Sequence, residues 1–219
     1  MTKFKLILFL FFLLVFVQCK KEEISDNSII AGYHDSSMFY KIQDSSHNIN
    51  FQWDSLQVTQ WATDTLLIEE GSSVYTLIFS LYRVNPDSLA QLPNNINYYP
   101  YTHFSVRSIN SDPVMIRYIT KKYYAGLGTV ASFDFVKPIQ KNAGIREDSM
   151  KTISNRELKF YEIPPPGGGS TLTNFDNGPW YNIHAVRYVG ILINKKLGWI
   201  KLDLNNNYQP RILAYAIQK

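Results

Sequence analysis

The side chains that could do metal or acid–base chemistry in this chain are few and widely spaced. The four histidines are His34, His47, His103 and His184, and Cys19 is the only thiol. None of the histidines has the HxH, HxxxH or HExxH spacing that brings two imidazoles to one metal ion. We therefore predict no metal site and no cofactor.

Covalent or acid–base catalysis also lacks a sequence signature. The chain has no GxSxG turn and no Ser-x-x-Lys pair, which are motifs of nucleophilic hydrolases. His34 and Asp35 could form half of a proton relay. However, adjacent residues of an extended chain face opposite ways, and a turn before a first strand explains the pair equally well. Catalytic residues stay unknown, and a hydrolase would have to depend on scattered carboxylates.

Aromatic residues are the more informative excess, because Phe, Trp and Tyr make up 15% of the chain and Tyr is the commonest of them. Phe79, Phe133 and Phe135 are expected to fill a core. Tyr and Trp in loops or on polar faces suit sugar stacking and protein interfaces, because each ring has a polar edge. The candidate binding residues are Tyr98, Tyr99, Tyr101, Trp180, Tyr181 and Trp199, together with His103 and Arg107.

Period-two alternation assigns faces to two of these candidates. In 102–109, Phe104 and Val106 point one way, and His103 and Arg107 point to the polar side. His103 beside Arg107 is therefore a candidate for ligand contact.

In 198–204 the same alternation places Trp199 opposite Ile200, Leu202 and Leu204. Trp199 is expected on an open face. The alternative is that a second sheet, the 137–156 loop or the N-terminal tether covers that face.

The elements that must position these residues are strands. Apolar segments are short, rich in Tyr, Phe, Val, Ile and Thr, and bounded by turn residues, and none has a convincing helical period. The predicted strands are 37–43, 48–53, 56–61, 65–69, 74–84, 102–109, 114–120, 129–136, 157–163, 181–193, 198–204 and 212–217. So many strands in one domain predict an all-β fold, an antiparallel β-sandwich of jelly-roll or immunoglobulin-like type with little or no helix.

Three further segments carry expectations. The later half of 181–193 is apolar on both sides, which predicts a central strand, and 194–196 and 205–207 are expected to turn hairpins. The charged segment 137–156 is expected to be a long solvated loop. The PPPGGGS run at 164–170 predicts a turn, and no helix pattern follows it to make a phosphate site.

The first residues predict export and a lipid anchor. Lys3 and Lys5 precede the apolar run Leu6–Val17, which is too short to span a bilayer as a helix and ends near Cys19. We expect a signal peptide at 1–18, a lipidated Cys19 with a flexible tether at 19–28, and one domain at 29–219. A lone cysteine leaves no disulfide to form.

Two stretches resemble known proteins. The CKKEE run at Cys19 resembles the start of Bacteroidota-type envelope lipoproteins, with Lys21, Glu22 and Glu23 matching and Gln18 departing from the usual small residue. The departure leaves an ordinary signal peptide or an uncleaved anchor as the alternatives. The ending YVGILINKKLGWIKLDL followed by ILAYAIQK is similar to that of uncharacterised members of the same class, which implies a β-sandwich ending. Their Asp-rich strand end is absent at 69–73, so we assign no calcium site.

Charge and resemblance together define the expected function. The net charge is +4 and no basic run exceeds two residues, so we expect no nucleic-acid partner. We expect a non-enzymatic, lipid-anchored extracytoplasmic β-sandwich that binds glycan or an envelope protein. The expected location is the cell envelope, at the outer membrane, with the surface and periplasmic faces both open. The alternative is a glycan-processing hydrolase with unidentified carboxylates.

Overall fold

Every regular element in the described part of the chain is a β-strand. The computed structural model describes residues 28–43, 49, 59–84, 102–110, 113–125, 129–148, 150–153, 157–163, 172–173, 177–181, 183–204 and 210–219. Its strands are β1 (Ser28–Ile30), β2 (Met38–Ile42), β3 (Thr59–Glu70), β4 (Ser73–Val84), β5 (Thr102–Ser108), β6 (Val114–Ala125), β7 (Thr129–Val136), β8 (Gly144–Arg146), β9 (Met150–Thr152), β10 (Leu158–Ile163), β11 (Leu172–Thr173), β12 (Val186–Ile193), β13 (Lys196–Leu204) and β14 (Pro210–Gln218). No helix in these ranges is long and apolar enough to cross a membrane.

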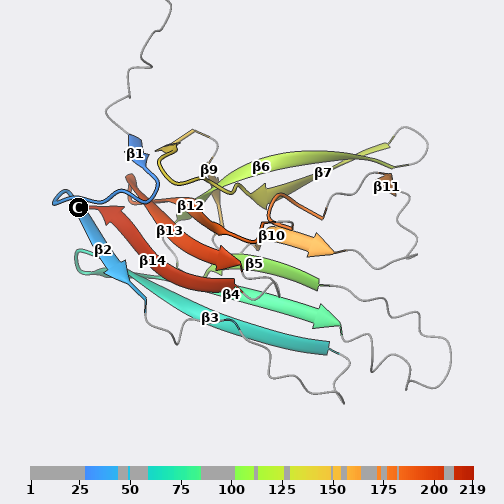
Figure 1. The fold of residues 1–219 in the computed structure, drawn as a ribbon, viewed down its shortest axis with the longest axis horizontal. Helices are drawn as coiled ribbons and strands as arrows, with labels where there is room; N and C mark the ends of the chain where they lie inside the picture. Colours follow the sequence, from blue (N-terminus) through green and yellow to red (C-terminus); the bar gives the residue numbers. More distant parts are fainter. Residues whose placement is uncertain are drawn as a thin grey trace, which may run out of the picture.

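Most of the strands join one large, curled sheet, seen in Figure 1. Its order is β2-β14-β13-β12-β6-β7-β10-β5-β4-β3, and β9 and β11 also pair with β6. Neighbours run antiparallel except β10 and β7, which are parallel, so the sheet is mixed. β1 and β8 form a separate antiparallel pair. The expected all-β, sandwich-like fold is confirmed.

The long strand β6 lets one sheet make two layers. Its first residues pair with β12 on one edge and β9 on the other, and its later residues pair with β7. The sheet can therefore fold over, with β2, β14, β13 and β12 as layer one and β10, β5, β4 and β3 as layer two. The inward side chains of the two layers form the main core.

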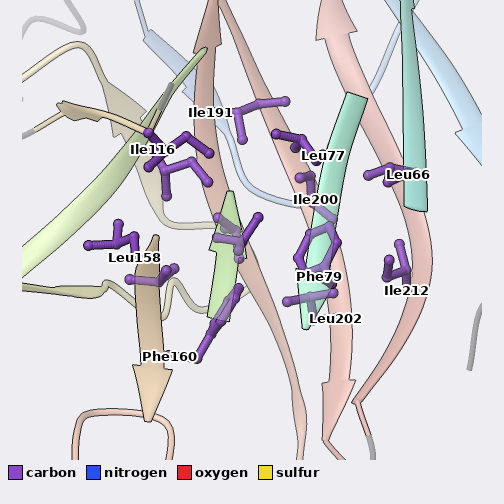
Figure 2. Packing of buried hydrophobic residues seen from close by; sticks show 14 of the residues in the cluster. Leu66, Leu77, Phe79, Ile116, Leu158, Phe160, Ile191, Ile200, Leu202 and Ile212 are labelled. Carbon is purple, nitrogen blue, oxygen red and sulfur yellow. The ribbon is translucent and has the colours of Figure 1, made fainter. Parts of the chain in front are cut away.

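The main core is built by period-two alternation on both layers. Figure 2 shows Leu66 and Phe79 of layer two packing toward Ile200 and Ile212 of layer one. All four side chains are fully buried. Burying one such side chain contributes about 1.5–3 kcal/mol relative to leaving it in water, so the cluster as a whole fixes how the layers face each other.

Polar contacts join the layers at one end. The β3–β4 turn places Glu70 beside the β12–β13 turn, where Lys196 pairs with it and Asn194 donates a hydrogen bond at 3.1 Å. Nearby, the Lys41 ammonium lies 3.2 Å from the Glu69 carboxylate. These contacts tie turns that are far apart in sequence, which limits sliding of one layer over the other.

A second core covers the outer face of layer one. Tyr188 and Trp199 project away from the main core and pack under Ile29 and Ile145, which belong to the β1–β8 pair. The chain enters this cover at Gly32, where φ is +78° and an added Cβ would lie 2.5 Å from the Tyr188 hydroxyl oxygen. Only glycine satisfies both the backbone angle and the close approach.

The predicted strands largely match the observed ones, with three revisions of length. The strand predicted at 181–193 begins only at Val186, because the described residues before it, Tyr181 included, lie in a turn and a bend. The segments 56–61 and 65–69 belong to one continuous strand, β3, within its described range, and 114–120 extends to residue 125 as β6. Strand 48–53 lies outside the described residues except for Ile49, and so does the PPPGGGS run.

The β12–β13 hairpin and the central position of β12 are confirmed. Asn194 and Lys195 both have positive φ, at 49° and 63°, as a two-residue type I′ turn requires. β12 lies between β13 and β6, and its residues from 188 onward are buried on both faces. β13 and β14 are also antiparallel neighbours, although their connection at 205–209 lies outside the described residues.

The expectation that 137–156 is a solvated loop is wrong. This segment contributes β8 and β9 and buries Ile139, Ile145 and Ile153. Its apolar residues are too sparse to form the apolar face of a helix. A single buried isoleucine is enough to anchor a short strand that packs against an existing sheet. Within this segment, β8 therefore covers layer one, and β9 pairs with one edge of β6.

Candidate functional site

Three aromatic side chains form a row across the outer face of layer two. Trp61 on β3 is in register with Tyr82 on β4, and Tyr82 is in register with His103 on β5. Residues directly opposite one another in a sheet share a face. The neighbours Ala62, Leu81 and Phe104 point into the main core. The row must therefore face outward, and we call Trp61, Tyr82 and His103 the aromatic site.

The aromatic site presents one open ring supported by two others. The Trp61 ring centroid lies 4.5 Å from that of Tyr82 and 6.1 Å from that of His103, and it meets the imidazole edge to face at 84°. Tyr82 and His103 are 5.2 Å apart. Trp61 keeps 63% of its surface exposed, whereas His103 keeps 7%. An indole held by ring contacts and open to water can stack on a flat apolar ligand face.

Glu157 adds an ionised carboxylate beside the row. Its Oε1 lies 3.3 Å from Nε2 of His103. The hydrogen bond with His103 lowers the pKa of Glu157 to about 2, with a further hydrogen bond from Ser105, although partial burial opposes the shift. The side chain stays 42% exposed. The carboxylate is therefore charged at any ordinary pH and can accept hydrogen bonds from a ligand.

Glu157 also lines a small polar depression of about 230 Å³, whose other members include Asp134 and Lys151. Burial alone would raise the pKa of Asp134, but hydrogen bonds from Lys151 and Thr120 lower it. Both carboxylates of this depression are thus held in the ionised form. Neither is suited to be the general acid of a glycosidase, which needs a raised pKa.

The two candidates on β5 have different surroundings. His103 and Arg107 share the outward face as predicted, because Phe104 and Val106 are buried in the main core. His103 belongs to the aromatic site but is covered by its neighbours, while Arg107 is exposed. Arg107 is in register with Ile78, four residues along the strand from His103, or about 13 Å. Arg107 therefore lies outside the aromatic site, on the same face of β5.

The structure corrects the expectation for Trp199. Alternation placed it opposite Ile200 correctly, but the expectation of an open face is wrong, because the indole is 2% exposed. The β1–β8 pair covers it, Tyr188 meets its ring edge to face at 5.3 Å, and its Nε1 donates to the Tyr33 carbonyl oxygen at 3.0 Å. A covered strand face was the alternative, and Trp199 leaves the candidate binding list.

The expectation that Trp180 is a candidate binding residue is also wrong, because its side chain is fully buried. Its Nε1 donates to the Val136 carbonyl oxygen at 2.8 Å, and its ring meets Phe160 at 5.2 Å. The turn after Gly178 carries the indole back into the core instead of outward. Tyr181 is half-buried and packs against the same core, so this loop offers no aromatic platform.

Four predicted residues lie outside the described part of the chain: Cys19, Tyr98, Tyr99 and Tyr101.

The pair His34 and Asp35 forms a turn. Asp35 Oδ1 accepts hydrogen bonds from the backbone N–H of Ser37 at 2.8 Å and from its hydroxyl at 2.5 Å, directly before β2. The His34 imidazole stacks on Tyr40 with centroids 3.7 Å apart. The turn explanation of this pair is the one that the geometry supports.

Trp61, Tyr82 and Glu157 are the site residues that sequence reasoning missed. Splitting β3 at 61 and 65 hid its alternation, in which Trp61 shares an exposed side with Leu67 while Leu66 and Ile68 are buried. Reading 59–70 as one strand would have placed Trp61 on an outward face, although its nearness to His103 depends on the strand order. Glu157 carries no local signal, because its partner is distant in sequence.

Comparison of the chain with protein-family models, curated proteins and solved structures gives no match. Within the described ranges, no group of three or more His, Cys, Asp or Glu side chains is placed to hold a metal ion. The site must therefore be interpreted from its own geometry.

Proposed function

We propose that this chain is a non-enzymatic glycan-binding protein, anchored to a membrane through a lipid on Cys19, and that the aromatic site is its binding surface. The observation that carries the proposal is Trp61, whose indole is 63% exposed yet held in place by Tyr82 and His103. An exposed large aromatic ring loses contact with water when a ligand stacks on it, and a pre-positioned ring loses little conformational entropy.

The polar neighbours of Trp61 suit a sugar better than an apolar ligand. A pyranose ring has one face of C–H groups for stacking and a rim of hydroxyls that need acceptors. Glu157 supplies a charged acceptor that needs no proton change to work. Ser105, on the same outward face of β5, is buried and donates a hydrogen bond to Glu157, while the exposed Arg107 lies at the edge of the site.

The position of the anchor is compatible with such a role. β1, the first described strand after Cys19, packs on the outer face of layer one. The aromatic site lies on the outer face of layer two, on the other side of the main core. A tether that enters on one side leaves the opposite face free for a ligand, whichever membrane face displays the protein.

The hydrolase alternative has one point in its favour, since Asp134 and Glu157 line one depression. Their lowered pKa values argue against it, because both carboxylates are bases and neither would hold a proton for a leaving group. Incubation of a bound oligosaccharide with the protein, followed by measurement of new reducing ends, separates the two functions. Binding without cleavage is the expected result.

The test of binding is a glycan array probed with the full chain at pH 8, in a detergent without a sugar headgroup. We expect Trp61→Ala to lose about tenfold in affinity for the glycans that the wild type binds, from about 1.4 kcal/mol of lost ring stacking. Tyr33→Ala is the matched control, because Tyr33 is 55% exposed but lies on the other side of the domain. A wild-type chain that binds no glycan, or equal binding by both variants, would contradict the proposal and favour a protein partner.

A further inference from the structure

A cavity of about 460 Å³ lies where β1, the start of β2 and the end of β14 meet, at the upper left of Figure 1. Sites for small ligands commonly have volumes of about 300–1,000 Å³. Ile29 and Met38 are the nearly buried apolar residues of its lining, at 8% and 7% exposure. Asp35 and Arg146 add opposite charges to the same lining. The cavity therefore suits a small ligand that is apolar in the middle and charged at both ends.

One wall of the cavity is an unpaired strand edge. Ala31 bonds to the segment before β8 through both its N–H and its C=O group, at 2.9 Å each. Because bonded residues alternate along an antiparallel pair, Ile29 also bonds toward β8, and Ser28 and Ile30 direct their backbone groups to the other edge. Within the described residues, no strand pairs with that edge. The Ile30 carbonyl oxygen accepts from the Tyr33 N–H at 3.1 Å, so three of the four backbone groups remain for a ligand.

We propose that this edge of β1 binds a short extended peptide with charged ends and an aliphatic central residue. A peptide that adds to a sheet edge gains main-chain hydrogen bonds. Antiparallel to β1, the third residue of a tripeptide lies opposite Ser28. Its N–H donates to the Ser28 carbonyl oxygen, and its carboxylate accepts from the Ser28 N–H. The carbonyl oxygen of the first residue accepts from the Ile30 N–H. This activity is separate from the proposed glycan binding, because β1 covers layer one and the aromatic site belongs to layer two.

The register of β1 and β8 explains the carboxylate and the aliphatic residue. Arg146 is in register with Ser28, so it lies at the end of the edge where the peptide carboxylate would bind. A guanidinium forms charge-assisted hydrogen bonds with such a group. The central residue of the peptide lies opposite Ile29, and directly opposite residues share a face. That face is the buried one, which also contains Met38, so the central side chain must be apolar.

Asp35 supplies the partner for the peptide ammonium, on the turn that follows the Ile30 end of the edge. Hydrogen bonds from Ser37 lower the pKa of Asp35, which keeps the carboxylate charged. Both of these bonds are accepted by Oδ1, so the second oxygen is available to an ammonium. The nearby Lys219 ammonium donates to the Ser36 carbonyl oxygen at 2.6 Å and is held there.

Isothermal titration calorimetry of the full chain in detergent with the tripeptide Ala-Leu-Ala tests the proposal. We expect saturable binding of one peptide per chain. N-methylation of the third residue removes the N–H that Ser28 accepts, and it should weaken binding about tenfold. N-methylation of the central residue is the matched control, because that N–H points away from β1, and it should change the affinity little. No binding of Ala-Leu-Ala, or equal losses from the two methyl groups, would overturn the proposal.

Free leucine separates edge binding from binding of any apolar zwitterion. The two edge residues Ser28 and Ile30 are about 7 Å apart along the strand, whereas both charges of leucine are attached to one carbon atom. Leucine should therefore bind about tenfold more weakly than Ala-Leu-Ala, since it cannot reach both ends. Equal affinity for the two ligands would contradict an extended ligand.

Variants of the charged residues test the two ends. Arg146→Gln should weaken binding of Ala-Leu-Ala about tenfold and should no longer distinguish it from its C-terminal amide. Asp35→Asn should do the same for the N-acetylated peptide. Arg211→Gln is the matched control, because this exposed arginine on β14 is in register with Asp203 and does not line the cavity. Wild-type affinity in Arg146→Gln would contradict the proposal, and the comparison of the two N-methyl peptides decides it even if a variant fails to fold.

Discussion

The indole Nε1 of Trp199 donates a hydrogen bond to the backbone carbonyl oxygen of Tyr33 across 3.0 Å. The bond joins a central strand of layer one to the segment that leads from β1 to β2. It makes Trp199 part of the cover on layer one, and it replaces the water that an exposed indole would bind.

Trp199→Ala should destabilise the domain strongly. Truncating a buried Trp leaves a cavity and removes its packing, for a loss of about 3–5 kcal/mol. Chemical denaturation measured by circular dichroism gives the difference in free energy of unfolding. Trp61→Ala is the matched control, and its loss should stay below about 1 kcal/mol because its indole is largely exposed. Similar losses in both variants would contradict the assigned burial.

Gly32→Ala should destabilise the domain more than Gly71→Ala does. Both glycines have positive φ, so both alanines meet backbone strain of about 1 kcal/mol. The added Cβ at Gly71 has open space, whereas at Gly32 it would lie 2.5 Å from the Tyr188 hydroxyl oxygen. The double variant with Tyr188→Phe should recover part of the extra loss. Equal denaturation midpoints for the two alanine variants would show that the cover does not approach Tyr188 closely.

Glu157 should make the free energy of unfolding depend on pH in the acidic range. Its folded-state pKa of about 2 is below the ordinary value of 4.5, so its stabilising effect is present above pH 4.5 and is lost as pH falls toward 2. Because its side chain is 42% exposed, solvent screening reduces the effect to about 1 kcal/mol. Thermal melting at several pH values should show a flatter acid dependence for Glu157→Gln. A wild-type slope retained in that variant would assign the acid sensitivity to other groups.

Cys19→Ser should release the protein from the membrane fraction, because the serine hydroxyl cannot take the thioether-linked lipid. Cell fractionation followed by immunoblotting measures the distribution, and metabolic labelling with a fatty acid measures lipidation. A cleaved Cys19→Ser form that stays in the membrane would contradict the proposed lipid anchor.

The strands were predictable where their alternation or apolar content was strong. β4 and β12 are rich in β-branched and aromatic residues, and β13 alternates Ile200, Leu202 and Leu204 with residues of the other face. Their turns carry Gly, Asn or Ser. The covering of layer one was not predictable in detail, because β1 and β8 are only three residues each. Such short strands form only where a sheet already offers them a surface, and a local pattern cannot contain that information.

Of the candidate site, only His103 could be predicted from the sequence, for a similar reason. His103 could be assigned to an outward face from β5 alone. Its partners Trp61, Tyr82 and Glu157 come from β3, β4 and the residue before β10, so their meeting depends on strand order. A single strand reports its own faces but not its neighbours, and the burial of Trp199 and His103 was decided by those neighbours.

The pairing of β2 with β14 has a kinetic consequence. Residues near the start of the described chain, such as Phe39, pair with residues near its end, such as Ile217. Layer one can therefore close only after the whole chain is available, and contacts of such long sequence separation slow folding. Until then β13 or β14 presents an unpaired edge that can recruit another chain. A chain shortened by a few C-terminal residues would lose the partner of β2 and should aggregate during folding more readily than the complete chain.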